Sequence, residues 1–299
     1  MNRIDDVMTK PMFLAALVVG LVVAEGALGA IAEGEEEAGA PTDLIIKPLE
    51  LPPGSTGGNE ASGCPRSVDS IQTTAEKEPP VSLLKMATTC MRERKPTLAV
   101  ALLTQMIKKD PVAAVAYLNR GSAHAALGEG VLALTDFTTA ISLQPDLADA
   151  WYNRGITYIH MRRLGNAIAD LTEVIRLKPS FAPGYCNRGL ANVQLGNYDE
   201  ALDDFTVGID KDPRLTFCHF NRGSLYLVIG EYQKAISDLT EARGHGPWKA
   251  TALSRRGQAY EALGRRTQAL NDFHAALELD PDLETAKEGV ARITKQQRP

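Results

Sequence analysis

One side chain with the chemistry to hold a peptide backbone returns at a constant interval. Asn119, Asn153, Asn187 and Asn221 are 34 residues apart, and Arg255 takes the next place in the series. A carboxamide offers a donor and an acceptor, which matches the hydrogen-bonding capacity of one peptide group. Each such bond would contribute about 0.5–1.5 kcal/mol, enough for binding that tolerates varied ligand sequences. The same asparagines could instead bond to a neighbouring helix, and the sequence leaves both roles open.

No catalytic or metal-binding spacing accompanies these asparagines. The five histidines occupy different phases of the 34-residue period, and none lies in an H-E-x-x-H arrangement. Phosphate-binding loops and the G-x-S-x-G turn of hydrolases are also absent from the sequence. We therefore expect a protein that is not an enzyme and that uses no cofactor and no metal.

The four cysteines form no C-x-x-C motif, so zinc and dithiol redox motifs are absent from the sequence. We favour a disulfide between Cys64, in a loop-like stretch, and Cys90, in the first expected helical segment. Reduced cysteines packed as small apolar residues are the alternative. Cys186 and Cys218 hold nearly equivalent places in successive repeats, and we expect their backbones to be too far apart for a bridge.

A proline every 34 residues defines the elements that must position these side chains. Apolar residues within each period fall at helical spacing, and a glycine near the middle divides the period into two helices. Each proline ends one helix pair and precedes the next, because proline cannot donate an interior helical hydrogen bond. A fixed period of this length is typical of a solenoid of stacked helical hairpins. The prolines are Pro111, Pro145, Pro179, Pro213, Pro247 and Pro281.

An arginine and an aspartate also recur in every period, always sixteen residues apart, as in Arg120 and Asp136. An anion-binding stripe of arginines is one interpretation. The matched aspartate favours another, in which each pair is a structural ion pair at the surface worth about 0–1 kcal/mol. We expect these arginines to belong to the scaffold.

The pattern resembles the tetratricopeptide repeat family over residues 80–283. The repeat beginning at Ala148 carries the expected residues of the motif, and so does the repeat beginning at Ala250. In the first of these the matching residues are Trp151, Gly155, Tyr158, Ala167, Leu171 and Pro179. Departures are few: Arg162 replaces the glycine between helices, Gly208 replaces a late alanine, and Asn192 replaces an aromatic residue.

This resemblance implies an all-α fold, a right-handed α-solenoid of helix-turn-helix hairpins. The expected units are a degenerate repeat at 80–113, full repeats at 114–147, 148–181, 182–215, 216–249 and 250–283, and a polar capping helix at 284–299. In the family, the first helix of each hairpin lines a concave groove. The asparagine series would lie in this groove with an apolar floor, where a peptide or an amphipathic helix of a partner protein would bind. Members of the floor would be Tyr152, Ile156, Leu190, Phe220 and Leu227; some of them could instead pack between helices.

The first 32 residues resemble an export signal. The apolar run from Met12 to Ala24 is too short to span a bilayer comfortably, and Ala30-Ile31-Ala32 fits a cleavage site. An uncleaved membrane anchor is the alternative. Residues 33–79 are rich in Glu, Pro and Gly, and we expect a flexible, disordered spacer there. The protein would be periplasmic or secreted, or else membrane-anchored with its repeats outside the cytoplasm.

The net charge of -5 and the mixing of basic with acidic residues argue against a nucleic-acid partner. We therefore expect an exported, non-enzymatic adaptor that binds a protein partner in the groove. A structural or self-assembling spacer without a groove ligand is the alternative. The sequence does not indicate the oligomeric state.

Overall fold

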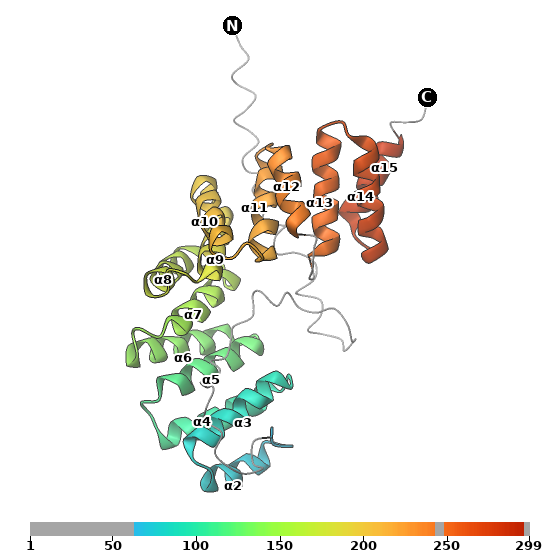
Figure 1. The fold of residues 1–299 in the computed structure, drawn as a ribbon. Coiled ribbons are helices and arrows are strands. Elements are labelled where there is room, and N and C mark those ends of the chain that lie inside the picture. The colour runs from blue at the N-terminus through green and yellow to red at the C-terminus, as the bar shows by residue number, and fades with distance from the viewer. Residues whose placement is uncertain (1–62, 243–247, 296–299) are drawn as a thin grey trace. The chain divides into compact units, whose positions relative to one another are not determined.

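The computed structural model describes residues 63–242 and 248–295 (Figure 1). Every regular element in these ranges is an α-helix, and the ranges contain no β-strand. The expected export signal and spacer residues 33–62 lie outside the described residues. The described chain divides at Pro179 into an N-terminal unit, residues 63–179, and a C-terminal unit that begins at Ser180.

The N-terminal unit consists of one short helix followed by three helical hairpins. Within each hairpin the two helices pack against each other, and the second helix packs against the first helix of the next hairpin. The helices are α2 (Asp69–Lys77), α3 (Pro80–Arg92), α4 (Pro96–Lys109), α5 (Ala114–Ala126), α6 (Gly130–Leu143), α7 (Ala148–His160) and α8 (Leu164–Leu177).

The C-terminal unit repeats the same arrangement with three hairpins and a final helix that packs on α13 and α14. Its helices are α9 (Ala182–Leu195), α10 (Tyr198–Lys211), α11 (Thr216–Val228), α12 (Tyr232–Ala242), α13 (Lys249–Ala262), α14 (Arg266–Leu279) and α15 (Glu284–Lys295). The expected all-α fold of tetratricopeptide type is confirmed.

Helix α2 corrects the expectation that the spacer extends to residue 79. Ile71 and Ala75, one helical turn apart, are both buried, and α2 packs against α4. Two apolar residues at this spacing are enough for a short helix when a neighbouring hairpin supplies the other side of the contact. The ordered fold therefore begins before the first hairpin.

The core of each hairpin follows the 34-residue period. In the five hairpins from α5 to α14, one large residue of the second helix is completely buried, and it packs against the first helix at the glycine of the Asn-Arg-Gly motif or its Arg-Arg-Gly equivalent. These residues are Phe137, Leu171, Phe205, Leu239 and Phe273. The periodicity thus arises because every hairpin buries the same face.

Every first helix in the described ranges ends at a residue with a positive φ angle. Gly128, Gly196, Gly230 and Gly264 take this left-handed conformation, as the sequence predicts, but Arg94 and Arg162 take it as well, with φ of 55° and 59°. A left-handed residue other than glycine costs about 1–2 kcal/mol because its Cβ crowds the following carbonyl oxygen.

Replacing Arg94 with glycine is therefore expected to raise the free energy of unfolding by about 0.5–1 kcal/mol, the relief of strain exceeding the entropy cost of glycine. Chemical denaturation of the full chain would measure it. Gly230→Ala is the matched control and should destabilise the protein. An unchanged or lower stability of the Arg94→Gly variant would contradict the prediction.

Candidate partner-binding site

The asparagine series lies on the first helices, but its side chains are buried. Asn119, Asn153, Asn187 and Asn221 are between 0% and 5% exposed. A carboxamide that grips a ligand backbone must reach solvent, so the described structure does not present these groups to a ligand.

The amide nitrogens of the series bond within the repeats. Those of Asn119, Asn187 and Asn221 donate to the carbonyl oxygen four residues earlier in their own helix, over 2.8, 2.9 and 2.8 Å. Nδ2 of Asn153 on α7 donates to Oγ of Ser122 on α5, over 3.1 Å. The sequence left open whether these asparagines serve a ligand or the scaffold, and these bonds favour the scaffold.

Arg255, which continues the series, is also buried, at 3% exposure. Its guanidinium lies 4.7 Å from the ring centroid of Phe220 and donates to Oγ of Ser224. Burial lowers the pKa of Arg255 to about 10, so the side chain stays protonated at neutral pH. Through its contacts with Phe220 and Ser224, Arg255 links α13 to α11 within the C-terminal unit.

The expected apolar floor is largely interior. Tyr152, Ile156, Leu190 and Phe220 are at most 5% exposed, and only Leu227 is partly exposed. Their packing between helices is the second of the two roles that the sequence allowed. Four of the five predicted floor residues are therefore part of the hydrophobic cores of the repeats, and only Leu227 reaches the surface.

Three exposed apolar side chains lie at the C-terminal ends of first helices. Leu127 at the end of α5 is 38% exposed, Leu195 on α9 49% and Ile229 at the end of α11 40%. Each directly precedes the glycine that ends the helix. This repeated aliphatic-glycine pair was the sequence signal for them, and the sequence reasoning missed it.

The periodic ion pairs are confirmed. Each arginine makes a two-pronged contact with the aspartate sixteen residues later, with shortest distances of 2.6–2.8 Å. Contrary to the surface pairs that the sequence suggested, all five aspartates are buried, at 4–6% exposure. The arginines are Arg120, Arg154, Arg188, Arg222 and Arg256, and their partners are Asp136, Asp170, Asp204, Asp238 and Asp272.

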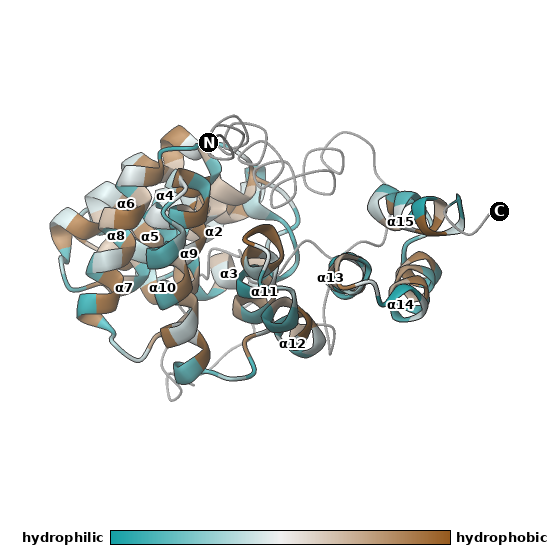
Figure 2. Ribbon diagram, turned by 90° about the horizontal axis from the view of Figure 1, so that it is seen from above, coloured by the Kyte–Doolittle hydropathy of each residue, from teal (hydrophilic) through white to brown (hydrophobic). Residues whose placement is uncertain are grey.

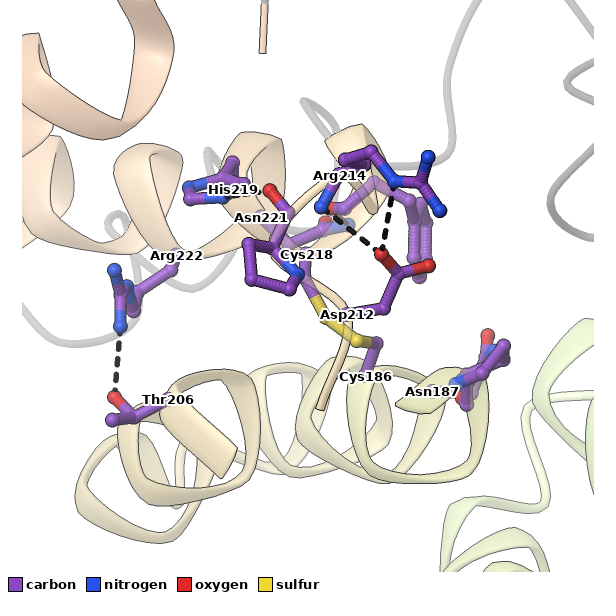
Figure 3. The surroundings of a disulfide bond; sticks show 12 residues. Cys186, Asn187, Thr206, Asp212, Arg214, Cys218, His219, Asn221 and Arg222 are labelled. Carbon is purple, nitrogen blue, oxygen red and sulfur yellow. Dashed lines mark hydrogen bonds and ion pairs between the residues drawn. A yellow bond between two sulfur atoms is a disulfide. The ribbon is translucent and has the colours of Figure 1, made fainter. Parts of the chain in front are cut away.

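A threonine sixteen residues earlier completes the arrangement. The guanidinium of Arg154 also donates to Oγ1 of Thr138, and that of Arg256 to Oγ1 of Thr240, over 3.1 and 2.9 Å. Arg222 donates in the same way to Thr206 (Figure 3). Each of these arginines therefore ties its own hairpin to the preceding one, and the period of threonine was a signal that the sequence reasoning missed.

His219 adds a second cation to one of these pairs. Its Nε2 lies 3.1 Å from the carbonyl oxygen of Pro213, and its Nδ1 lies 3.2 Å from Oδ1 of Asp238. Both partners only accept hydrogen bonds, so a ring that satisfies both must carry two protons. The hydrogen bond with Asp238 raises the pKa of His219 against the opposing effects of burial and of the Arg222 charge. Burial works against ionisation of Asp238, but its bonds with Arg222 and His219 outweigh that effect and lower the carboxyl pKa.

Because the pKa of His219 is raised in the folded protein, its contribution to stability is complete below its unfolded value and is lost as pH rises through its folded value. The free energy of unfolding of the wild type should therefore fall relative to that of His219→Tyr as the pH rises above about 6.5, the ordinary histidine value, and through the raised pKa of His219. Tyrosine is the matched replacement, because Tyr117 donates to the carbonyl oxygen of Pro111 from the same place in its repeat. Urea unfolding across this pH range measures the difference, and parallel curves would refute the assignment.

The structure contains two disulfides. Cys64 and Cys90 are joined with their Cα atoms 4.8 Å apart. Cys186 on α9 and Cys218 on α11 are joined with their Cα atoms 5.4 Å apart, which corrects the expectation that these backbones are too distant (Figure 3).

Gly208 on α10 makes room for the second bridge. A Cβ atom at this position would lie 2.6 Å from Sγ of Cys186 and 2.8 Å from Sγ of Cys218. The departure from alanine at this place in the repeat therefore has a cause: the sulfur atoms occupy the space of the methyl group.

Acidic, cysteine and histidine side chains do not gather into a metal site in the described ranges. His245 lies outside them. Each remaining histidine is on a different part of the repeats, so the structure brings together no histidine set for catalysis within the described residues.

Three sequence models of the tetratricopeptide repeat match the chain. One matches residues 148–181 and 250–283, a second 84–137 and a third 182–206. These segments fall on the hairpins described above. The chain is a tetratricopeptide repeat protein. Members of this family are generally non-enzymatic scaffolds for protein–protein interaction.

Solved structures with the same fold cover most of this tetratricopeptide protein. The PilF protein of Pseudomonas aeruginosa is 17% identical, with a TM-score of 0.65 over 75% of this chain and 99% of its own. PilW, a type IV pilus biogenesis factor, is 18% identical, with a TM-score of 0.63 over 71% and 98%. YrrB, described as having an unusual peptide-binding site, is 21% identical, with a TM-score of 0.53 over 63% and 97%. At these identities the likeness establishes the shared fold.

No protein of curated function matches the sequence of this tetratricopeptide protein. Among the helices that the structure describes, none has both the length and the apolar character needed to cross a bilayer.

Proposed function

We propose that this tetratricopeptide protein is an exported, non-enzymatic scaffold that binds an apolar peptide or an amphipathic helix of a partner protein along its first helices. The observation that carries the proposal is the exposure of aliphatic side chains at the C-terminal ends of the neighbouring helices α9 and α11, Leu195 and Ile229; Leu227 is partly exposed. Aliphatic anchors repeated on packed helices suit the apolar face of a partner helix or peptide.

Export is supported by the apolar N-terminal run and by the cysteine chemistry. Disulfides persist in oxidising compartments and are rare in the cytosol. Both pairs of cysteines are bridged, and the second pair is buried. The proposed location is the periplasm, the cell envelope or the extracellular space; attachment through an uncleaved N-terminal segment is the alternative.

A second candidate function is a structural or self-assembling array without a peptide ligand. The internal hydrogen bonds of the asparagine series favour it, because the groups proposed to hold a ligand backbone already serve the helices.

Affinity capture from an envelope extract, read by mass spectrometry, would test the proposal with three forms of the full chain. The first is the wild type, and the second is Leu195→Ser with Ile229→Ser. The third is Leu279→Ser, a matched control whose residue on α14 is similarly exposed at 48%. Circular dichroism would confirm that all three are folded.

A partner retained by the wild type and the control but lost from the double variant would support binding along α9 and α11. Its affinity for each variant would then be measured with a synthetic peptide from that partner. Equal capture by all three forms would refute this surface. Self-association of the purified protein with no heterologous partner would favour the structural array.

A further inference from the structure

Helix α6 differs from the other second helices in the character of its outer face. Its one ionisable residue, Asp136, is buried in the ion pair with Arg120. Val131 is 67% exposed and Leu132 is 50% exposed, and Leu127, just before α6, is 38% exposed. We call these three exposed side chains, which lie within six residues of sequence, the α6 patch. Figure 2 shows the hydropathy of each described residue on the ribbon, α6 included.

The repeat itself does not require apolar residues at this place. The residues equivalent to Val131 and Leu132 on α8 are Gly165 and Asn166, and those on α10, α12 and α14 are polar or charged. Each other second helix in the described ranges also has an exposed charged residue: Lys108 of α4, Arg176 of α8, Asp199 of α10, Lys234 of α12 and Arg266 of α14. Exposed side chains add nothing to the hairpin core, so the α6 patch calls for a covering group.

A segment of the same chain has matching chemistry. Leu44–Leu51 reads Leu-Ile-Ile-Lys-Pro-Leu-Glu-Leu, an apolar stretch within a sequence otherwise rich in Glu, Gly, Pro and Ser. Its two charges, Lys47 and Glu50, cancel. The apolar side chains of this segment can be buried on an uncharged helix face, whereas Lys47 and Glu50 would have to stay in solvent.

The attachment of this segment places it within reach of α6. Residues 52–62 connect it to Gly63, and the adjacent Cys64 is bonded to Cys90 on α3. A connection of this length spans up to about 40 Å. Helix α3 packs on α5, which packs on α6, and packed helices lie about 8–10 Å apart. A short tether also raises the effective concentration of the segment to about the millimolar range.

We propose that residues Leu44–Leu51 dock on the α6 patch. This contact is separate from the proposed partner site on α9 and α11, because the α6 patch lies in the N-terminal unit. It would cover the largest aliphatic exposure on α6 and would hold the chain that leads to the N-terminus against the repeats.

Photo-crosslinking within the full chain tests the contact directly. A benzophenone amino acid replaces Val131, and mass spectrometry locates the crosslinked peptide after irradiation. The expected product is an intramolecular adduct with residues 44–51. Ile45→Asp with Ile46→Asp should reduce its yield about tenfold or more, because the carboxylates would be buried without partners.

The same amino acid in place of Gly165, the equivalent position on α8, is the matched control and should give no such adduct. If the Val131 variant fails to fold, Thr135, which is exposed one turn later on α6, serves as a second site. An adduct with a second copy of the chain or with another segment would overturn the proposal. So would the absence of any adduct, or a yield that the aspartate substitutions leave unchanged.

Discussion

Replacing Asp272 with alanine is expected to lower the free energy of unfolding by about 3 kcal/mol, the largest loss expected at any of the five periodic ion pairs. The side chains of Asp272 and Arg256 are only 9% and 8% exposed, which makes this pair the most enclosed of the five. Two hydrogen bonds join them, and the arginine also donates to Thr240. With alanine at position 272, the enclosed guanidinium of Arg256 would lose its carboxylate partner. Of these three hydrogen bonds it would keep only the one to the hydroxyl of Thr240.

Urea unfolding followed by circular dichroism would measure the loss, and hydrogen exchange would place it at α13 and α14. Asp282→Ala is the control, because its carboxylate is 97% exposed and its pair with Lys287 contributes little. Arg256→Met combined with Asp272→Leu should recover much of the loss, since it removes the isolated charge. A loss below about 1 kcal/mol for Asp272→Ala would mean that the pair behaves as an exposed one.

Replacing Gly208 with alanine is expected to destabilise the wild type by about 2 kcal/mol, because the added methyl group would overlap both sulfur atoms of the Cys186–Cys218 disulfide. The double variant Cys186→Ala with Cys218→Ala should itself lose about 2–4 kcal/mol. In that background the sulfur atoms are gone, and Gly208→Ala should become neutral or stabilising. The prediction is thus a change of sign between the two backgrounds.

A double-mutant cycle of unfolding free energies would measure this coupling. Gly165→Ala is the matched control: Gly165 also lies in a second helix, and a Cβ there would meet no atom within 4 Å. It should stabilise both backgrounds equally, by about 0.5–1 kcal/mol. Equal effects of Gly208→Ala with and without the disulfide would contradict the explanation of this glycine.

The periodic polar residues serve the scaffold. The arginines, aspartates and asparagines are all committed to contacts within the repeats, as the buried pair at Asp272 and the helix-bonded Asn221 show. Partner binding is then left to the side chains that the repeats expose, of which Leu195 and Ile229 are the ones proposed.

The sequence by itself determined the fold and the pairing of the repeats. Spacing along a helix fixes which side chains share a face, and a 34-residue period fixes which faces recur, so the hairpins, the helix ends at glycine and the pairing of Arg120 with Asp136 could all be predicted. These are properties of one hairpin and its repetition.

Only the tertiary structure decided which periodic residues reach solvent. The burial of Asn153 depends on how closely α7 approaches α5, where the hydroxyl of Ser122 accepts a hydrogen bond from the Asn153 amide. The spacing of residues within one helix does not predict the distance between two helices. The same holds for the cysteines: whether Cys186 reaches Cys218 depends on the distance between α9 and α11 and on the space that Gly208 leaves for the two sulfur atoms. Helix α2 likewise forms on a surface that α4 provides. Local pattern sets the elements, whereas contact between elements sets exposure, and exposure decides which residues can bind a partner.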